Sequence, residues 1–204
     1  EYDKLMSFIG SEGTNAYTST DMTVYVEQIP SNQIENWARI QADRFANPVI
    51  RGFHTELETV YEEKNMSLTK DFRKALEAMD GMLFPDHPYG TQTVLGTQEH
   101  LKNPSITNIK NYQKTYYVPN NMAICLSGDF DPDEMIAVIE KYFSQMEPNK
   151  DLPEITLTTS SKIESPVEKN VYGLDAENIM IGWKYPGAKS EDALVADVAA
   201  SVLY

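Results

Sequence analysis

Apolar positions along the chain follow two different periods, one typical of strands and one typical of helices. In residues 15–29, Met22, Val24 and Val26 alternate with Thr23 and other polar neighbours, which predicts a strand within a hairpin. After Pro30 the apolar residues recur every three or four positions until Asn47-Pro48, which predicts a helix with a broad buried face. The core residues expected on that face are Ile34, Trp37, Ala38, Ile40 and Phe45.

Further helices are expected at residues 55–82, 105–116, 131–145 and 190–204. The third is supported by Asp131-Pro-Asp-Glu134, which offers an N-cap, a proline in the first turn and an acidic N3 residue. Strands are predicted at 122–127 and 178–185, with at most a short one near Ile155. The Pro-, Ser- and Thr-rich region 148–168 is expected to be an extended linker. Helices mixed with antiparallel strands, without a βαβ glycine fingerprint, indicate an α+β fold.

Composition removes several classes of protein. The 204 residues are 41% apolar, which is enough for a real core. No apolar run approaches the length of a membrane span. A net charge of −14 disfavours nucleic acid as a partner, because phosphate binding needs clustered Lys and Arg. The single cysteine, Cys125, excludes a disulfide framework and is expected to be a small buried hydrophobic residue.

Two carboxylates stand out on the helix predicted after Thr55. Glu56 and Glu63 are seven positions apart, so they lie on one stripe of the helix, roughly 10 Å apart along its axis. That separation is too large for both to bind one metal ion directly. One can be a ligand and the other an auxiliary group beside it. The alternative is structural, since Glu favours helices and Thr55 with Glu58 fits a capping box.

Other candidate ligands are weaker. His54, His87 and His100 each lack a second His or Cys at coordinating spacing, which favours structural roles. Asp129, Asp131 and Asp133 begin like a calcium loop, but the glycine and terminal Glu spacing fail, so helix capping is preferred.

Several motifs in this order resemble the insulinase/pitrilysin family of zinc metallopeptidases, in particular its bacterial processing-protease-like members. The motifs are Asn15-Ala-Tyr-Thr-Ser-Thr-Asp-Met-Thr-Val-Tyr25, the Glu56/Glu63 pair, His87-Pro-Tyr-Gly90, Tyr116-Tyr-Val-Pro-Asn-Asn-Met122 and Ser127-Gly-Asp-Phe130. The resemblance covers essentially the whole chain. It implies the LuxS/processing-peptidase-like fold, in which helices are layered on a largely antiparallel sheet.

The resemblance implies peptide hydrolysis by a zinc-activated water, with zinc held by two histidines of a His-x-x-Glu-His motif and one downstream glutamate. Glu63 matches that glutamate, and Glu56 matches the auxiliary catalytic position before it. The His-x-x-Glu-His motif is absent from this sequence. We therefore expect a central fragment of a larger enzyme, inactive alone and without tightly bound zinc. Residues 1–100 would end a catalytic domain, and residues 101–204 would begin the following homologous, inactive segment.

The resemblance also implies that Asn15, Ala16 and Thr18 bind an extended peptide substrate along a strand edge. The structural alternative is a plain hairpin strand. The expected partners are peptide substrates and either the remainder of the same chain or a homologous half-subunit. The bacterial periplasm or cell envelope is favoured over the cytoplasm. A second hypothesis is a non-catalytic homologue that forms the scaffold or peptide-binding half of a two-part chamber.

Overall fold

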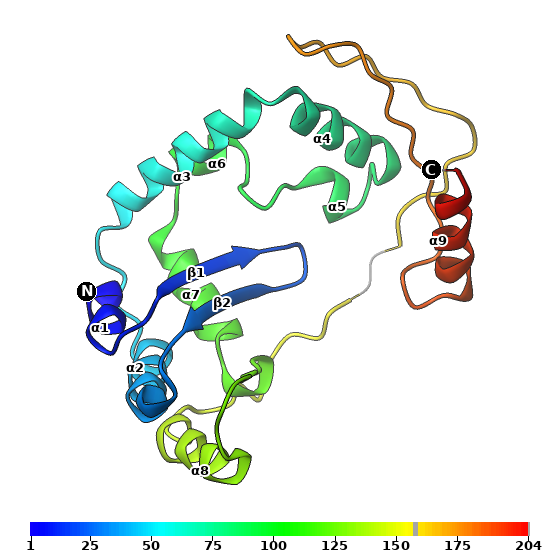
Figure 1. The fold of residues 1–204 in the computed structure, drawn as a ribbon. Coiled ribbons are helices and arrows are strands. Elements are labelled where there is room, and N and C mark those ends of the chain that lie inside the picture. Colours follow the sequence, from blue (N-terminus) through cyan, green and yellow to red (C-terminus); the bar gives the residue numbers. More distant parts are fainter. Residues whose placement is uncertain (157–158, 204) are drawn as a thin grey trace. The chain divides into compact units, whose positions relative to one another are not determined.

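The structure, a computed structural model, describes residues 1–156 and 159–203 (Figure 1). Internal contacts divide the chain into two units. Unit 1 contains residues 1–58 and 99–156, and unit 2 contains residues 59–98 together with the described part of 157–204. Each unit is thus built from two separate stretches of sequence.

Unit 1 combines a hairpin with helices. Its elements are α1 (Tyr2–Phe8), β1 (Gly13–Thr18), β2 (Thr23–Gln28), the short 3-10 helices Ser31–Gln33 and Pro119–Asn121, α2 (Ile34–Ala46), α7 (Ile106–Tyr116) and α8 (Pro132–Phe143). Helix α3 (Phe53–Leu68) passes from unit 1 into unit 2, and α6 (Gln98–Lys102) passes back. Unit 2 also contains α4 (Asp71–Leu83), α5 (Pro88–Thr91) and α9 (Glu191–Leu203).

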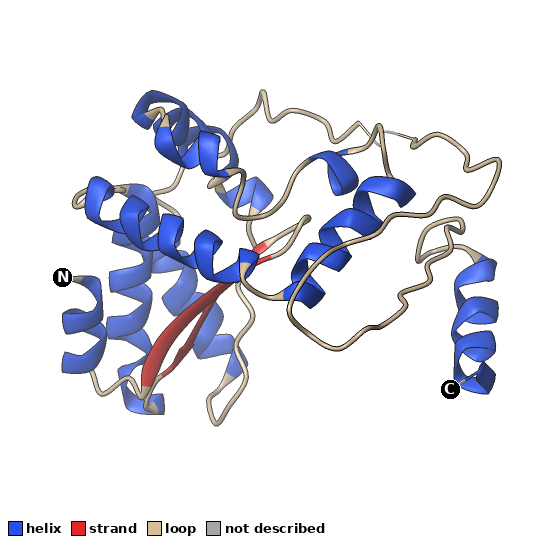
Figure 2. Cartoon of the chain, turned by 90° about the horizontal axis from the view of Figure 1, so that it is seen from above, coloured by secondary structure: helices blue, strands red, loops and turns tan. Residues whose placement is uncertain are grey.

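The strands β1 and β2 form an antiparallel pair, which is the whole sheet within the described part of the chain (Figure 2). Gly13 lies opposite Gln28 and Thr18 lies opposite Thr23. Together with the helices, this pair confirms the α+β class. The predicted hairpin in residues 15–29 is therefore present.

The core of unit 1 lies where α1 and α2 meet α8. Met6 and Ala38 are fully buried, and Trp37 is nearly so. Leu126, Phe130 and Val138 pack against this cluster from later in the sequence. The helical apolar face predicted around Trp37 is therefore core, as expected.

Helix ends agree with the sequence where caps are local. The Asp131 carboxylate accepts hydrogen bonds from the Asp133 and Glu134 amides at 2.9 and 3.1 Å, so helix capping is the role found for it. Ser105 likewise caps α7 by accepting from the Asn108 amide at 3.2 Å. The final predicted helix is α9, although Tyr204 lies outside the described residues.

The predicted helix 55–82 is wrong as a single element, because it is two helices. α3 ends at Leu68, where the Thr69 hydroxyl donates to the Met66 carbonyl at 2.7 Å. Such a side-chain bond competes with helix continuation. Lys70 is then extended, and α4 begins at Asp71.

Two predicted strands are not found in the part of the chain that the structure describes, and the region near Ile155 has no strand there either. Residues 122–127, 178–185 and the region near Ile155 are outside regular secondary structure. Two apolar residues of the second segment are exposed, with Ile179 at 89% and Trp183 at 74%. Cys125 is also exposed, so its predicted burial is wrong. A strand needs a neighbour for its backbone groups, and none of the described residues supplies one here. Within the predicted linker 148–168, residues 157 and 158 lie outside the described residues.

Candidate functional site

The acidic stripe is carried by α3. Gly52 has a φ of +64°, a left-handed conformation that suits glycine, and the helix starts directly after it. The Glu56 amide donates to the Gly52 carbonyl at 3.1 Å, which places Glu56 in the first turn. Glu56 and Glu63 are both exposed on this helix. Because Thr55 lies inside α3, it does not act as the N-cap, and the capping-box interpretation is wrong.

The described residues do not supply a complete set of zinc ligands. Among the residues described, no group of three or more His, Cys, Asp or Glu side chains is arranged to hold a metal ion. Catalytic zinc takes three protein ligands and keeps an open position. The donor set of this chain therefore does not fit zinc by itself, and Glu63 is one ligand candidate of the several required.

His87 and His54 make contacts with residues close to them in the sequence. His87 Nδ1 accepts a hydrogen bond from the Tyr89 amide at 3.1 Å and caps α5, which agrees with a structural role. His54 makes an edge contact with Phe53, with ring centroids 5.7 Å apart. The close approach of α5 to the end of α4 explains the glycine of this motif, because a Cβ on Gly90 would overlap the Phe84 carbonyl oxygen.

A buried cation lies next to Glu63 in the sequence. Lys64 is only 4% exposed, and its ammonium group is 3.0 Å from Glu77 Oε1 on α4. It also donates to the Thr93 hydroxyl at 3.5 Å. Gln98 adds a second link to α3 through a 2.7 Å hydrogen bond to Asn65 Oδ1. These contacts fix the rotation of the second half of α3 about its own axis. They therefore also fix the direction of the helix face that carries Glu63.

The buried position of Lys64 was not predicted from the sequence. Lysine is normally exposed, and it is almost never fully buried unless it is paired. Its partners Glu77 and Thr93 are 13 and 29 residues away, so no local pattern reveals them.

The predicted peptide-binding residues lie on β1. The Ser19 amide donates to the Met22 carbonyl at 2.8 Å, which marks one pair of facing residues in the ladder. Along antiparallel strands, pairs that hydrogen-bond to each other alternate with pairs whose backbone N–H and C=O groups point away from the partner strand. Ala16 and Thr18 therefore point their backbone groups away from β2, along the free edge of β1.

The Asn15 side chain already occupies this edge. Asn15 Oδ1 accepts a hydrogen bond from the Ala16 amide at 2.8 Å. Thr18 shares a 3.2 Å hydroxyl contact with Thr23 across the hairpin. A peptide that paired with β1 at Ala16 would have to replace this bond.

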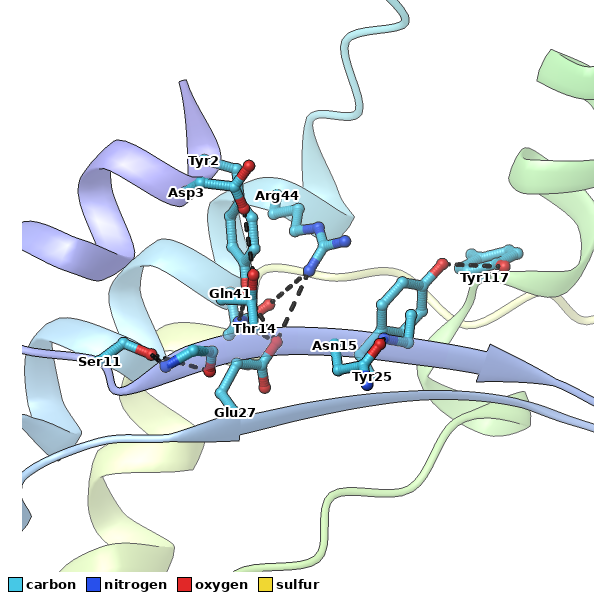
Figure 3. A network of polar contacts seen from close by, with 12 residues as sticks. Tyr2, Asp3, Ser11, Thr14, Asn15, Tyr25, Glu27, Gln41, Arg44 and Tyr117 are labelled. Atoms are coloured by element: carbon cyan, nitrogen blue, oxygen red, sulfur yellow. Dashed lines mark hydrogen bonds and ion pairs between the residues drawn. The ribbon is translucent and has the colours of Figure 1, made fainter. Parts of the chain in front are cut away.

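A polar network anchors the hairpin to the helices of unit 1 (Figure 3). Gln41 Nε2 donates to Glu27 Oε1 at 3.0 Å, and the Tyr2 hydroxyl donates to the same oxygen at 2.7 Å. The guanidinium of Arg44 lies 3.8 Å from Glu27 Oε1 and 4.1 Å from the centre of the Tyr2 ring. Burial and the Glu27 bond raise the pKa of Tyr2 to about 12. Tyr2 therefore stays a neutral donor at physiological pH.

A hollow of about 820 Å³ lies beside β2. It is lined by β2 and by residues 122–127, which include Ile124 and Cys125. Tyr25 reaches across unit 1 to Tyr117, with 3.2 Å between their hydroxyl oxygens. No sequence pattern predicted this hollow.

Glu56 and Glu63 thus share one helix, as predicted, while Asn15, Ala16 and Thr18 all lie on strand β1 in unit 1. Glu63 belongs to unit 2. No helix in the described part of the chain has the length and apolar character needed to cross a membrane.

Comparisons with known proteins define the class. Residues 105–204 match the family model described as the peptidase M16 inactive domain. Zinc protease PqqE of Helicobacter pylori is 24% identical over 221 residues, covering 100% of this chain and 47% of that protein. An uncharacterized zinc protease of Mycobacterium leprae, ML0855, is 30% identical over 138 residues, covering 66% and 30%. The chain therefore spans less than half the length of these relatives.

A solved structure agrees on the fold. The first half of the periplasmic protease PqqL from Escherichia coli superposes with a TM-score of 0.68 at 20% identity, covering 79% of this chain and 36% of that one. The relatives from Helicobacter pylori and Mycobacterium leprae are both named zinc proteases. The match of residues 105–204 and these relatives support an insulinase/pitrilysin-like family member.

Proposed function

We propose that the protein to which this chain contributes is a zinc-dependent metalloendopeptidase that hydrolyses unstructured peptides. The observation that carries the proposal is the pair of exposed carboxylates, Glu56 and Glu63, two turns apart on one face of α3. Relatives named as zinc proteases support it. The described residues of this chain lack a complete zinc site, so the remaining ligands must come from other residues of the protein.

Glu63 is the proposed metal ligand, and Glu56 is the proposed auxiliary carboxylate. Their separation of roughly 10 Å along the helix prevents both from binding one ion. Lys64 supports this arrangement, because its ion pair with Glu77 holds the second half of α3 in one rotation. Asn15, Ala16 and Thr18 are the proposed contacts for the substrate backbone. PqqL of Escherichia coli is a periplasmic protease, which supports a periplasmic location for this protein too.

Two substitutions test the division of roles in the complete protein. Glu63→Gln should lose zinc and peptidase activity together, because a metal ligand is removed. Glu56→Gln should keep most of the zinc but turn over more slowly, since auxiliary groups tune the ligands without binding the ion. Zinc is measured by elemental analysis, and activity with a quenched fluorescent peptide. Glu62→Gln is the matched control, because Glu62 is also exposed on α3 but lies off the stripe.

The alternative is a non-catalytic subunit that forms a scaffold or peptide-binding half of a two-part chamber. It is favoured by the family description of residues 105–204 as an inactive domain. In that case Glu63→Gln and Glu56→Gln would both leave zinc content and turnover unchanged. Equal zinc loss in both variants would contradict the separate roles given to the two carboxylates.

A further inference from the structure

Residues 160–184 run out along α4 and back again, and we call this segment the strap. It begins just after the carboxyl end of α4, where the Asp86 carboxylate accepts hydrogen bonds from the Ser160 hydroxyl at 3.0 Å and from the Ser161 amide at 2.9 Å. The Ser161 hydroxyl also donates to this carboxylate. A charged acceptor strengthens each of these bonds, so the strap is tied firmly to this end of α4.

The middle of the strap is tied to the opposite end of α4. Asp71 is the first residue of this helix, and its carboxylate accepts hydrogen bonds from the Leu174 amide and, at 2.8 Å, from the Asp175 amide. The Lys74 ammonium group donates to the same carboxylate at 2.8 Å. The bond from Lys74, together with those from the two amides, holds the pKa of Asp71 at about 2, below the usual 3.8. The anchor is therefore charged at neutral pH.

Glycine allows the strap to approach α4 closely at two places. A Cβ on Gly173 would overlap the Asp71 carboxylate. A Cβ on Gly182 would lie 2.7 Å from Met79 Sδ and 3.2 Å from Leu83 Cδ1, in the second half of α4. A side chain at Gly173 would therefore force the strap away from the helix.

The return half of the strap closes on its own beginning. The Lys184 ammonium group donates to the Ser161 carbonyl at 2.6 Å and lies 5.3 Å from the centre of the Phe84 ring. Lys184 is half-buried, whereas Trp183 and Tyr185 on either side of it are exposed. This alternation is typical of an extended segment that lays one face on a surface. The strap thus contacts α4 at both ends and along its second half.

Helix α4 in turn holds α3 through a buried ion pair. The Lys64 ammonium group lies 3.0 Å from Oε1 of Glu77, which is in the middle of α4. Lys64 is only 4% exposed, so a displacement of α4 would leave a buried charge without its partner. The strap, α4 and the second half of α3 all belong to unit 2.

We propose that the strap holds α4 by both ends and, through the Glu77–Lys64 pair, keeps the second half of α3 in place. The strap lies within residues 105–204, which match the family model of an inactive domain. A segment matched to an inactive domain thus supports the helix that carries Glu56 and Glu63. This support concerns the positions of two helices, so it depends neither on zinc nor on peptidase activity.

Gly173→Ala tests the strap without changing either helix, because the added Cβ would displace the strap from Asp71. In the complete protein, hydrogen exchange followed by mass spectrometry should become at least about tenfold faster for the α4 amides around Glu77, and at least about threefold faster for residues 64–68 of α3. Amides of α2, which belongs to unit 1, should exchange as before. Gly187→Ala is the matched control, because a Cβ on Gly187 meets nothing within 4 Å and Gly187 lies outside the strap.

A second variant approaches the same contact from the helix. Asp71→Ala removes the acceptor of the Leu174 and Asp175 amides. It should therefore accelerate exchange in the same regions as Gly173→Ala. Its control is Lys74→Met, which removes the ion pair with Asp71 but leaves the two amide bonds. Exchange in that control should stay within about twofold of the unchanged protein.

The coupling to α3 is tested in a Lys64→Met background, where the link between the helices is absent. There Gly173→Ala should still accelerate exchange in α4 but no longer in α3. Unchanged exchange in both helices after Gly173→Ala and Asp71→Ala would overturn the strap. Faster exchange in α4 alone, or equal acceleration of α3 with and without Lys64, would overturn its coupling to α3. Equal acceleration in α2 would overturn the proposal as well, because the effect would then be a general loss of stability.

Discussion

Replacing Glu77 with glutamine should destabilise the α3–α4 pair more than replacing Lys64 with methionine, although both changes break the same ion pair. The Lys64 side chain is 5% exposed and that of Glu77 is 37% exposed. Glu77→Gln leaves a buried ammonium group with a neutral acceptor and the Thr93 hydroxyl at 3.5 Å. Lys64→Met leaves a carboxylate that water already reaches, and it keeps most of the buried aliphatic length.

The expected losses in the free energy of unfolding follow from how deeply each charge is buried. Removing one partner of a fully buried pair costs about 3–5 kcal/mol, because a charge is left uncompensated. The exposure of Glu77 and the remaining amide oxygen reduce this to about 2 kcal/mol for Glu77→Gln. A carboxylate open to water loses little with its partner, so Lys64→Met should cost about 0–1 kcal/mol. The double variant should resemble Lys64→Met alone.

Hydrogen exchange of the α4 amides provides the assay, supported by urea unfolding followed by far-ultraviolet circular dichroism. Lys74→Met is the control, because the 2.8 Å Lys74–Asp71 pair joins residues three positions apart and Asp71 keeps hydrogen bonds from the Leu174 and Asp175 amides. Its effect should stay below about 1 kcal/mol. The assigned roles of the two charges are refuted if Lys64→Met costs more than Glu77→Gln, or if the two effects add in the double variant.

Three other predictions each concern one residue. Gly90→Ala should destabilise unit 2 by about 1–3 kcal/mol in urea unfolding, because its Cβ would overlap the Phe84 carbonyl oxygen; an unchanged midpoint would contradict this contact. Hydrogen bonds from the Ser161 hydroxyl and amide hold the pKa of Asp86 at about 2, below the usual 3.8. Their contribution is therefore present above about pH 4 and lost as pH falls toward 2, so Asp86→Asn should speed exchange of the Ser161 amide at pH 6 but not at pH 2. In the complete protein, Asn15→Ala should lower kcat/KM across a panel of unrelated peptides by a similar factor, equivalent to about 1–3 kcal/mol, and unchanged kinetics would remove Asn15 from the substrate site.

Local sequence signals predicted the elements that depend on local bonds. Asp131 and Ser105 cap their helices because each partner amide lies two or three residues ahead. The Glu56/Glu63 stripe was also predictable, because it requires only that α3 be helical. Trp37 was placed correctly in the core for the same reason.

The features that were not predicted depend on distant partners. Residues 122–127 are outside any described strand because a strand is defined by the neighbour to which it bonds. Cys125 lies in this segment and is exposed. Lys64 is buried because Glu77 lies across from it on another helix. Sequence periodicity contains no information on either partner.

In the candidate site, one feature was predictable from local sequence and another depends on a distant partner. The helical period places Glu56 and Glu63 on one face, yet it does not fix the direction of that face. The buried bond from Lys64 to Glu77 fixes the rotation of α3, because turning the helix would move a charge away from its partner in a region that water hardly reaches. The proposed ligand Glu63 must be held in place, because metal coordination tolerates only small deviations in the distance between ligand and ion. The residue that best supports the proposed role of Glu63 is therefore its neighbour in the sequence, whose own partner is 13 residues away.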